Sequence, residues 1–92
     1  MGRTVRADGM MLKALPNGLE VTRFGCAIPR KAIPKAAMRN RYKRWLREAF
    51  RLHQTQLPRG MDLVAVITES PEDPSFRTVE ATFLQLCKRL SG

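Results

Sequence analysis

Apolar and polar residues alternate with the two-residue period of a β-strand in two early segments of the chain. Residues 9–15 (GMMLKAL) and residues 19–28 (LEVTRFGCAI) each predict a strand. The Asn17-Gly18 pair between them is a strong hairpin signal, so we expect the two strands to pair. Residues 1–8 are polar and short, and we expect them to be flexible.

The second of these strands has two unlike faces. Phe24, Cys26 and Ile28 share one face and are apolar. On the other face, Arg23 is followed only by the small residues Gly25 and Ala27. This pattern predicts a sheet with one packed side and one open side. The open side is either a ligand-binding surface or a plain solvent surface.

A helix is predicted from residue 35 to about residue 54, after a basic loop at residues 29–34 (PRKAIP). Pro34 is suited to the first turn of that helix. Its apolar stripe recurs at spacings of three and four residues. The stripe consists of Met38, Tyr42, Trp45, Leu46, Ala49, Phe50, Leu52 and His53.

The last third of the chain predicts one strand and one helix. Residues 61–68 (MDLVAVIT) are mostly apolar and rich in β-branched side chains, which is typical of a central, parallel strand. Asp73 is expected to cap the second helix, with Pro74 at its first position. One face of residues 75–90 carries Phe76, Val79, Phe83, Leu84, Cys87 and Leu90. The order β-β-α-β-α predicts a single α+β domain over residues 1–92, a two-layer sandwich.

Positive charge is concentrated in one part of the chain. The 92 residues carry a net charge of +9, and nine of the 17 Lys and Arg residues lie between Arg30 and Arg51. Glu48 is the one acid in that segment. The rest of the chain is nearly neutral, so the charge serves a local purpose. Such a surplus indicates a polyanionic partner, most simply a nucleic acid.

The predicted basic helix separates its cations from its apolar stripe. With 100° per residue, one face carries Asn40, Lys43, Arg44, Arg47 and Arg51, and Arg39 and Arg41 lie at its margins. Glu48 can pair with Arg44 or Arg51 but cannot neutralise the whole face. Arginine forks match phosphate groups, and Asn40 could reach a base edge or a 2′-hydroxyl. The alternatives are a solvated amphipathic helix and a membrane-surface helix.

Several classes of protein and site are excluded or disfavoured. No apolar run has the roughly 20 residues of a membrane span, and no secretory signal is present. Cys26 and Cys87 are far apart and form neither a metal pattern nor a disulfide framework, which is typical of a cytoplasmic protein with reduced thiols. His53 is the one histidine, so we expect no catalytic or metal-ligating residues. The alternative to a chain without metal ligands is a magnesium site formed by paired carboxylates in the loop that holds Glu69, Glu72 and Asp73.

Residues 39–50 (RNRYKRWLREAF) resemble the RNR signature of the bacterial ribonuclease P protein component, R-N-R-x-K-R-x-x-R-E. The flanking segments resemble that family too. A G-x-x-V strand corresponds to Gly25 to Ile28, and a basic loop containing Arg30 and Lys31 follows it. After the helix, a G-x-D-x-V strand begins at Gly60 and precedes the C-terminal helix. The resemblance covers roughly residues 9–90.

The resemblance implies the small protein subunit of a ribozyme, and therefore of an endoribonuclease. In that family the RNA subunit cleaves the 5′ leader from precursor tRNA, with Mg²⁺ held mainly by the RNA. The implied partners are ribonuclease P RNA and the 5′ leader, with no membrane and no obligate protein partner. The resemblance also implies a small mixed sheet with a left-handed βαβ crossover, contrary to the general right-handed rule.

Family roles are carried over only to matching positions of this chain. The positions implied to bind RNA are Arg30, Lys31, Arg39, Asn40, Arg41, Lys43, Arg44 and Arg47. The positions implied to face the leader are Arg23, Gly25 and Ala27, with Lys13 as a further candidate whose facing the sequence leaves open.

The sequence departs from the family pattern at three places. The family usually opens with a helix that carries aromatic residues, whereas only eight polar residues precede Gly9 here, so the resemblance does not support the part of the leader cleft that this helix forms. The loop before the helix usually contains a glycine, and this chain has Ala32-Ile33-Pro34. The strand after the helix usually ends near an Ala-Arg pair, and this one continues as Thr68-Glu69, without that cation.

Two other functions are compatible with the residues. One is a non-catalytic module that binds structured RNA but has lost the leader cleft. The other is a DNA-binding helix for a major groove, although no helix-turn-helix partner precedes the basic helix. Stimulation of precursor-tRNA cleavage would distinguish the ribonuclease P subunit from both.

Overall fold

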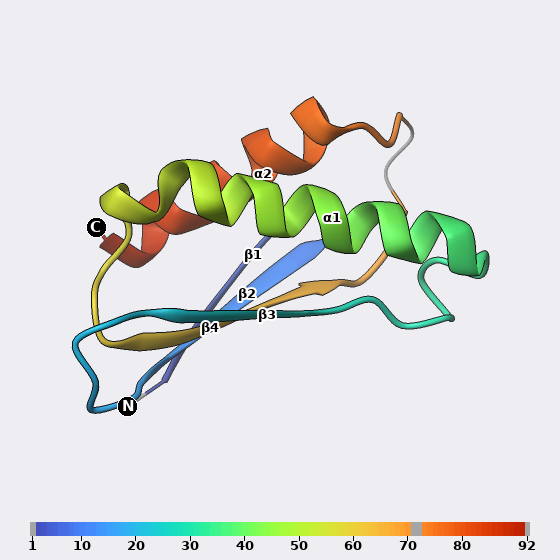
Figure 1. Cartoon of the computed structure of the whole chain (residues 1–92). Helices are drawn as coiled ribbons and strands as arrows, with labels where there is room; N and C mark the ends of the chain where they lie inside the picture. Colours follow the sequence, from blue (N-terminus) through green and yellow to red (C-terminus); the bar gives the residue numbers. More distant parts are fainter. Residues whose placement is uncertain (1, 71–72, 92) are drawn as a thin grey trace.

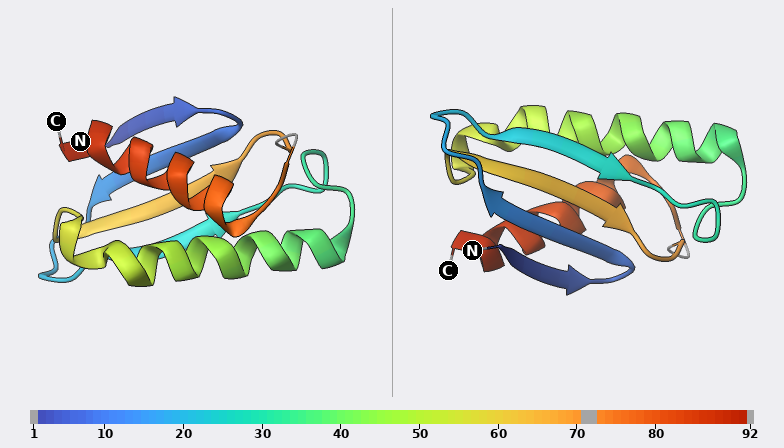
Figure 2. Two further views of the ribbon diagram at one scale, coloured as in Figure 1. Left: turned by 90° about the horizontal axis from the view of Figure 1, so that it is seen from above. Right: turned by 90° about the horizontal axis from the view of Figure 1, so that it is seen from below.

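The protein is a two-layer α+β sandwich, described by a computed structural model for residues 2–70 and 73–91 (Figure 1). The strands are β1 (Arg3–Ala7), β2 (Met10–Pro16), β3 (Arg23–Ala27) and β4 (Met61–Ile67). The helices are α1 (Ala36–His53), the short 3₁₀ helix η1 (Gln54–Gln56) and α2 (Phe76–Ser91). Both long helices cover the same face of the sheet, as predicted, and leave the other face open (Figures 1 and 2).

The first strand was not predicted, so the expected flexibility of residues 1–8 is wrong for β1. β1 pairs antiparallel with β2, and the turn between them is Asp8-Gly9, with φ angles of 47° and 78°. Two positive φ values are what a tight two-residue hairpin requires. The Arg3 guanidinium also donates hydrogen bonds to the carbonyls of Leu90 (2.8 Å) and Arg89 (3.2 Å). These bonds fasten the edge strand to the end of α2.

The predicted hairpin between residues 9–15 and 19–28 is also wrong. The strand order is β1-β2-β4-β3, so β4 lies between β2 and β3. β4 is antiparallel to β2 and parallel to β3, which confirms the central position and parallel pairing predicted for it. Asn17 instead bonds the residue before β4, since its N–H donates to the carbonyl of Gly60 (2.9 Å). Gly60 is required there, because its φ is 71° and a Cβ would lie 2.7 Å from the Leu19 carbonyl oxygen.

The crossover from β3 through α1 to β4 is left-handed. The left view of Figure 2 looks at the sheet from the helix side. If that view is turned so that the parallel strands β3 and β4 point upward, β4 lies to the left of β3 and α1 lies in front of the sheet. This confirms the handedness that the resemblance implied, against the general preference.

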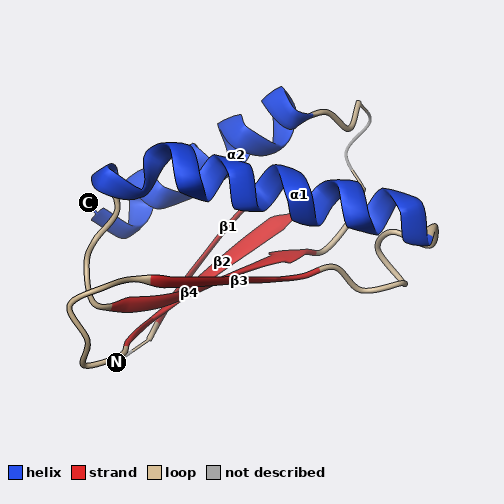
Figure 3. Cartoon of the chain, viewed as in Figure 1, coloured by secondary structure: helices blue, strands red, loops and turns tan. Residues whose placement is uncertain are grey.

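The core lies between the sheet and the two helices (Figure 3). Tyr42, Leu46 and Ala49 of α1 are fully buried, as the helical pattern predicted. Leu52 was expected in the same stripe, but it is 49% exposed because it lies beyond the edge of that packed face. Phe24 of β3 stacks on Phe50 of α1, with ring centroids 4.8 Å apart. This contact joins the edge strand to the basic helix.

The helix starts differ from the predicted ones. α1 begins at Ala36, so Pro34 lies before the helix and not in its first turn. α2 is capped by Ser75, whose Oγ accepts the N–H of Thr78 at 3.2 Å. Asp73, the predicted cap, lies two residues before Ser75. Leu86, absent from the predicted apolar stripe of α2, is fully buried, while Leu84 is only half-buried.

Candidate nucleic-acid interface

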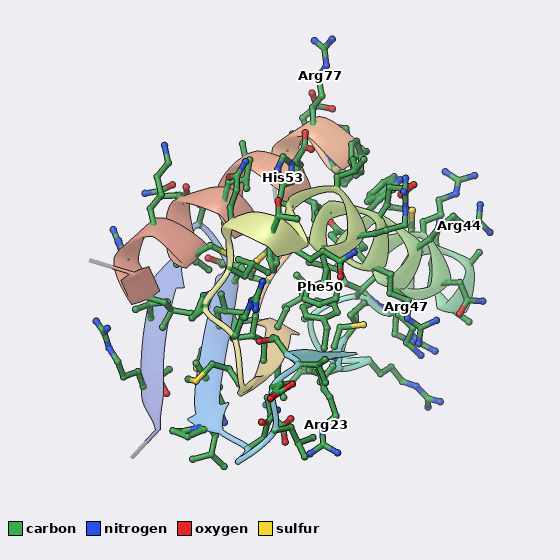
Figure 4. The ribbon with its side chains drawn as sticks, turned by 60° about the vertical axis from the view of Figure 1, so that its left-hand side comes forward. Arg23, Arg44, Arg47, Phe50, His53 and Arg77 are labelled. Carbon is green, nitrogen blue, oxygen red and sulfur yellow. The ribbon has the colours of Figure 1, made fainter. Side chains whose placement is uncertain are left out.

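The exposed face of α1 carries a stripe of cations along most of the helix. We call it the basic face. Its groups line a shallow groove and come from one helix: Asn40, Lys43, Arg44, Arg47, Glu48 and Arg51. Figure 4 shows Arg44 and Arg47 projecting from α1 into solvent on the same side. The predicted separation of cations from the apolar stripe is therefore confirmed.

One ion pair neutralises only the end of the basic face. The Arg51 Nε donates to the Glu48 Oε1 at 2.6 Å. This hydrogen bond holds the pKa of Glu48 below and the pKa of Arg51 above their ordinary values. Of the two partners that the sequence allowed for Glu48, the structure selects Arg51. Lys43, Arg44 and Arg47 therefore keep their charge available.

The basic face borders the edge strand β3. Cys26 of β3 is half-buried against α1, and burial raises the pKa of its thiol. The nearby charges of Arg47 and Lys43 act in the opposite direction. These two cations therefore lie near β3 on the helix side of the sheet. The thiol of Cys87, deeper in the core, has its pKa raised to about 12 by burial; both cysteines are free, as predicted.

A compact turn before α1 presents two further cations. The carbonyl of Pro29 accepts the N–H groups of Ala32 and Ile33, each at 3.0 Å. Arg30 and Lys31 are exposed at the tip of this turn, and Ile33 is buried at its base. Arg41 is exposed at the margin of the basic face, as predicted. Arg39 differs, because it is half-buried and its Nη1 donates to the carbonyls of Ile33 and Pro34.

The open face of the sheet brings the four leader-facing candidates together. Arg23, Gly25 and Ala27 are exposed, while Phe24 and Cys26 are half-buried, so the predicted faces of β3 are confirmed. Lys13 lies on the same open face, since it pairs with Val64, which in turn pairs with Gly25. A Cβ on Gly25 would meet nothing within 4 Å. The surface above that residue is therefore bare.

Sequence reasoning missed two groups on the open face. Arg6 of β1 faces the same way as Lys13, because Thr4 pairs with Lys13 and residues alternate along the strand. The Asp8-Gly9 hairpin signal would have revealed this strand. Asp62 pairs with Arg23 through two hydrogen bonds of 2.7 and 2.8 Å. A third bond of 3.1 Å reaches Asp62 from the Asn17 amide.

These bonds make the carboxyl of Asp62 a source of acid sensitivity. Hydrogen bonds from Arg23 and Asn17 hold its pKa below the ordinary value, so its stabilising effect is present above about pH 4 and is lost as the pH falls through the lowered pKa. We expect Asp62→Asn to lower the free energy of unfolding slightly at pH 7. The difference from wild type should vanish near about pH 2.

Urea unfolding at several pH values measures this difference, with Glu20→Gln as the control variant. Glu20 is an exposed loop residue, and its replacement should leave the pH profile unchanged. An equal effect of Asp62→Asn at neutral and acid pH would contradict the assignment.

The described residues bring no metal-binding cluster together. In residues 2–70 and 73–91, no three His, Cys, Asp or Glu side chains lie close enough to hold a metal ion. His53 packs between the helices, with its Nε2 2.9 Å from the Glu80 Oε2. Pro71 and Glu72 lie outside the described residues, so the predicted acidic loop is described only in part. No described helix is long and apolar enough to cross a membrane.

Comparisons with known proteins agree with the geometry. A sequence model of the ribonuclease P family matches residues 1–91. The chain is 35% identical to the ribonuclease P protein component of Thermotoga maritima over 95 residues, covering 99% of this chain and 80% of the relative. It is 42% identical to the component of Vibrio cholerae over 78 residues, covering 85% of this chain and 65% of the relative.

Solved structures show the same fold. The RNase P protein from Thermotoga maritima superposes with a TM-score of 0.86 at 34% identity, covering 99% of this chain and 86% of that protein. The RNase P protein of Staphylococcus aureus superposes with a TM-score of 0.81 at 20% identity, covering 98% of this chain and 81% of that protein.

Proposed function

The chain belongs to the bacterial ribonuclease P protein family and is a subunit of that tRNA-maturing ribonucleoprotein, and we propose that two of its surfaces bind two different RNA partners. The basic face of α1, together with Arg30 and Lys31, binds the catalytic RNA. The open face of the sheet binds the 5′ leader of precursor tRNA. The chain works in the cytoplasm, which its two free thiols favour.

The unneutralised cations of α1 carry the proposal for the catalytic RNA. Lys43, Arg44 and Arg47 are exposed on one helix face whose single acid is already paired with Arg51. Like charges on one face repel each other, and a polyanion relieves that repulsion while releasing its condensed counterions. Arginine can also bind phosphate through two parallel hydrogen bonds.

The bare strip of sheet beside the basic face supports the proposal for the leader. Gly25 and Ala27 leave the backbone of β3 accessible to a ligand, with Lys13 two strands away. An extended single strand can lie along such a strip and find cations at its border. Arg6 lies on the same face and extends the positive border, whereas Arg23 of that face is paired with Asp62.

We expect the magnesium ions of the reaction to be held mainly by the RNA subunit. The donor set of the described residues does not fit a metal centre of this chain's own. Mg²⁺ supplies Lewis-acid chemistry and charge neutralisation where phosphate oxygens gather. The protein's cations reduce phosphate repulsion, and its open face positions the substrate.

Reconstitution tests the proposed function. Purified protein is mixed with a bacterial ribonuclease P RNA and a precursor tRNA at low Mg²⁺, where RNA alone is nearly inactive. The protein should stimulate cleavage at the mature 5′ end, and an Arg39→Ala/Arg41→Ala variant should not. Tight RNA binding without stimulation would favour the structured-RNA-binding module instead.

Replacement of Gly25 by leucine tests the leader surface. A Cβ there meets no neighbour within 4 Å, and no left-handed φ requires glycine, so the fold should tolerate Gly25→Leu. The bulky side chain should obstruct the strip, raising KM for precursor tRNA about tenfold or more, on the scale of losing one stacked or packed nucleotide. A tRNA lacking the leader should compete equally well against wild type and variant.

Ala81→Leu is the matched control, because Ala81 is exposed on α2, which covers the opposite face of the sheet. It adds the same side chain at a distance from the open face and should leave KM unchanged. Unchanged KM for Gly25→Leu would contradict leader binding at this strip.

A further inference from the structure

We propose that Arg39 is a positioning residue that holds the turn at residues 29–34 in shape, and not a direct phosphate contact like its neighbours on α1. The inference rests on the proposed RNA-binding role of that turn. It separates one arginine of the RNR block from the others by what its side chain touches.

The turn depends on only a few interactions. The carbonyl of Pro29 accepts two N–H groups, from Ala32 and Ile33, which closes the turn around Arg30 and Lys31. The side chain of Ile33 is 4% exposed and anchors the base in the core. The residues after this anchor belong to no strand or helix, since β3 ends at Ala27 and α1 begins at Ala36, so their carbonyls are not bonded within such an element.

Arg39 satisfies those carbonyls. Its Nη1 donates to the carbonyl oxygen of Ile33 at 2.9 Å and to that of Pro34 at 2.8 Å. A single guanidinium nitrogen thus bridges two successive residues at the junction between turn and helix. The side chain is half-buried, unlike the exposed side chains of Arg44 and Arg47.

Electrostatics supports a structural role for this charge. Arg39 lies in the first turn of α1, where a cation is opposed by the helix dipole and where no acidic residue compensates. The Lys35 cap contributes no side-chain hydrogen bond. The two carbonyl dipoles therefore provide the favourable interaction for the guanidinium, and charge-assisted hydrogen bonds of this kind are stronger than neutral ones.

The proposed role predicts a loss that charge alone cannot rescue. A lysine keeps the charge but is one bond shorter and lacks the planar guanidinium, so it should not bridge both carbonyls. In Arg39→Lys, the turn should loosen and Arg30 and Lys31 should lose their fixed direction. Arg77→Lys is the matched control, because it makes the same change at an exposed arginine in the first turn of α2, away from the basic face.

Amide hydrogen exchange in the free protein tests the bridge without RNA. The amides of Ala32 and Ile33 should exchange about tenfold faster in Arg39→Lys than in wild type, because local opening becomes easier. They should be unchanged in Arg77→Lys. Equal protection of these amides in wild type and Arg39→Lys would overturn the proposal.

Binding to ribonuclease P RNA supplies the second readout. Affinity should fall about tenfold in Arg39→Lys and stay within about twofold in Arg77→Lys, a difference comparable to losing one to two phosphate contacts. Adding Arg30→Ala/Lys31→Ala to Arg39→Lys should then cost much less than it does in wild type, since the residues act as a unit. Fully additive losses, or wild-type affinity in Arg39→Lys, would overturn the proposal.

Failure of the proposed RNA-binding function has a different signature. In that case wild type itself would bind ribonuclease P RNA no better than an unrelated RNA, and Arg44→Ala would change nothing. The exchange of the Ala32 and Ile33 amides would still report whether Arg39 holds the turn.

Discussion

Replacing Arg44 and Arg47 together by alanine should weaken binding of ribonuclease P RNA about 30-fold at 0.15 M salt, the amount expected for two lost phosphate contacts. The plot of log affinity against log salt should become shallower by about 2. Both side chains are exposed on the basic face, and neither takes part in the Glu48–Arg51 pair. Titration of labelled RNA at four or more salt concentrations measures both quantities.

A variant with the same change in net charge provides the control. Arg77→Ala/Lys88→Ala removes two exposed cations from α2, and Figure 4 shows Arg77 projecting from α2 away from Arg44 and Arg47. If net charge alone drove binding, both double variants would lose affinity equally. If the basic face binds the RNA, the α2 variant should stay close to wild type.

Thermal stability should not explain the loss in Arg44→Ala/Arg47→Ala. Removing two like charges from one helix face reduces repulsion, and alanine is the best helix former. The variant should therefore melt at the wild-type temperature or slightly above it. A lowered melting temperature would show that these arginines serve the fold as well.

The basic helix could be predicted from sequence because its determinants are local. The three- and four-residue spacing of Tyr42, Trp45 and Leu46 fixes the packed side, and the cations occupy what remains. Alternation along a strand is equally local, so the two faces of β3 were predicted correctly.

The sheet order could not be predicted in the same way, because strand pairing is a long-range choice. The Asn17-Gly18 pair suggested a hairpin between β2 and β3, but the apolar strand β4 lies between them and pairs with both. Asn17 bonds Gly60 and Asp62 at the start of β4 and closes no hairpin with β3. The Asp8-Gly9 signal was genuine but lay in a segment whose composition suggested flexibility.

The side-chain partners of individual arginines could not be predicted from the sequence either. Arg23 and Arg39 have the same residue type as the free cations of α1, yet Arg23 is paired with Asp62 and Arg39 bridges two carbonyls. Asp62 lies 39 residues from Arg23 along the chain and becomes its neighbour only through the parallel pairing of β3 and β4. A motif therefore identifies the helix, whereas the fold decides which of its cations are available.

Leu46→Ala is expected to produce the reverse of the arginine result, with stability lost and the RNA-binding groups intact. Leu46 is fully buried between α1 and the sheet, and such a truncation costs about 2–5 kcal/mol. For a domain of this size that is a large fraction of the total stability, and the melting temperature should fall by about 10 °C or more. Leu52→Ala, the same change on the same helix at a side chain that is 49% exposed, should cost no more than about 0.5 kcal/mol.

RNA binding by Leu46→Ala then distinguishes the anchor of α1 from its contact surface. At a temperature where this variant is still folded, its affinity should be close to wild type, since Arg44 and Arg47 are unchanged. Saturating RNA should raise its melting temperature, because a ligand that binds only the folded state stabilises that state. If Leu46→Ala is folded by circular dichroism but does not bind RNA, the apolar side of α1 also shapes the RNA-binding surface. Equal destabilisation by Leu46→Ala and Leu52→Ala would contradict the packing of α1 on the sheet.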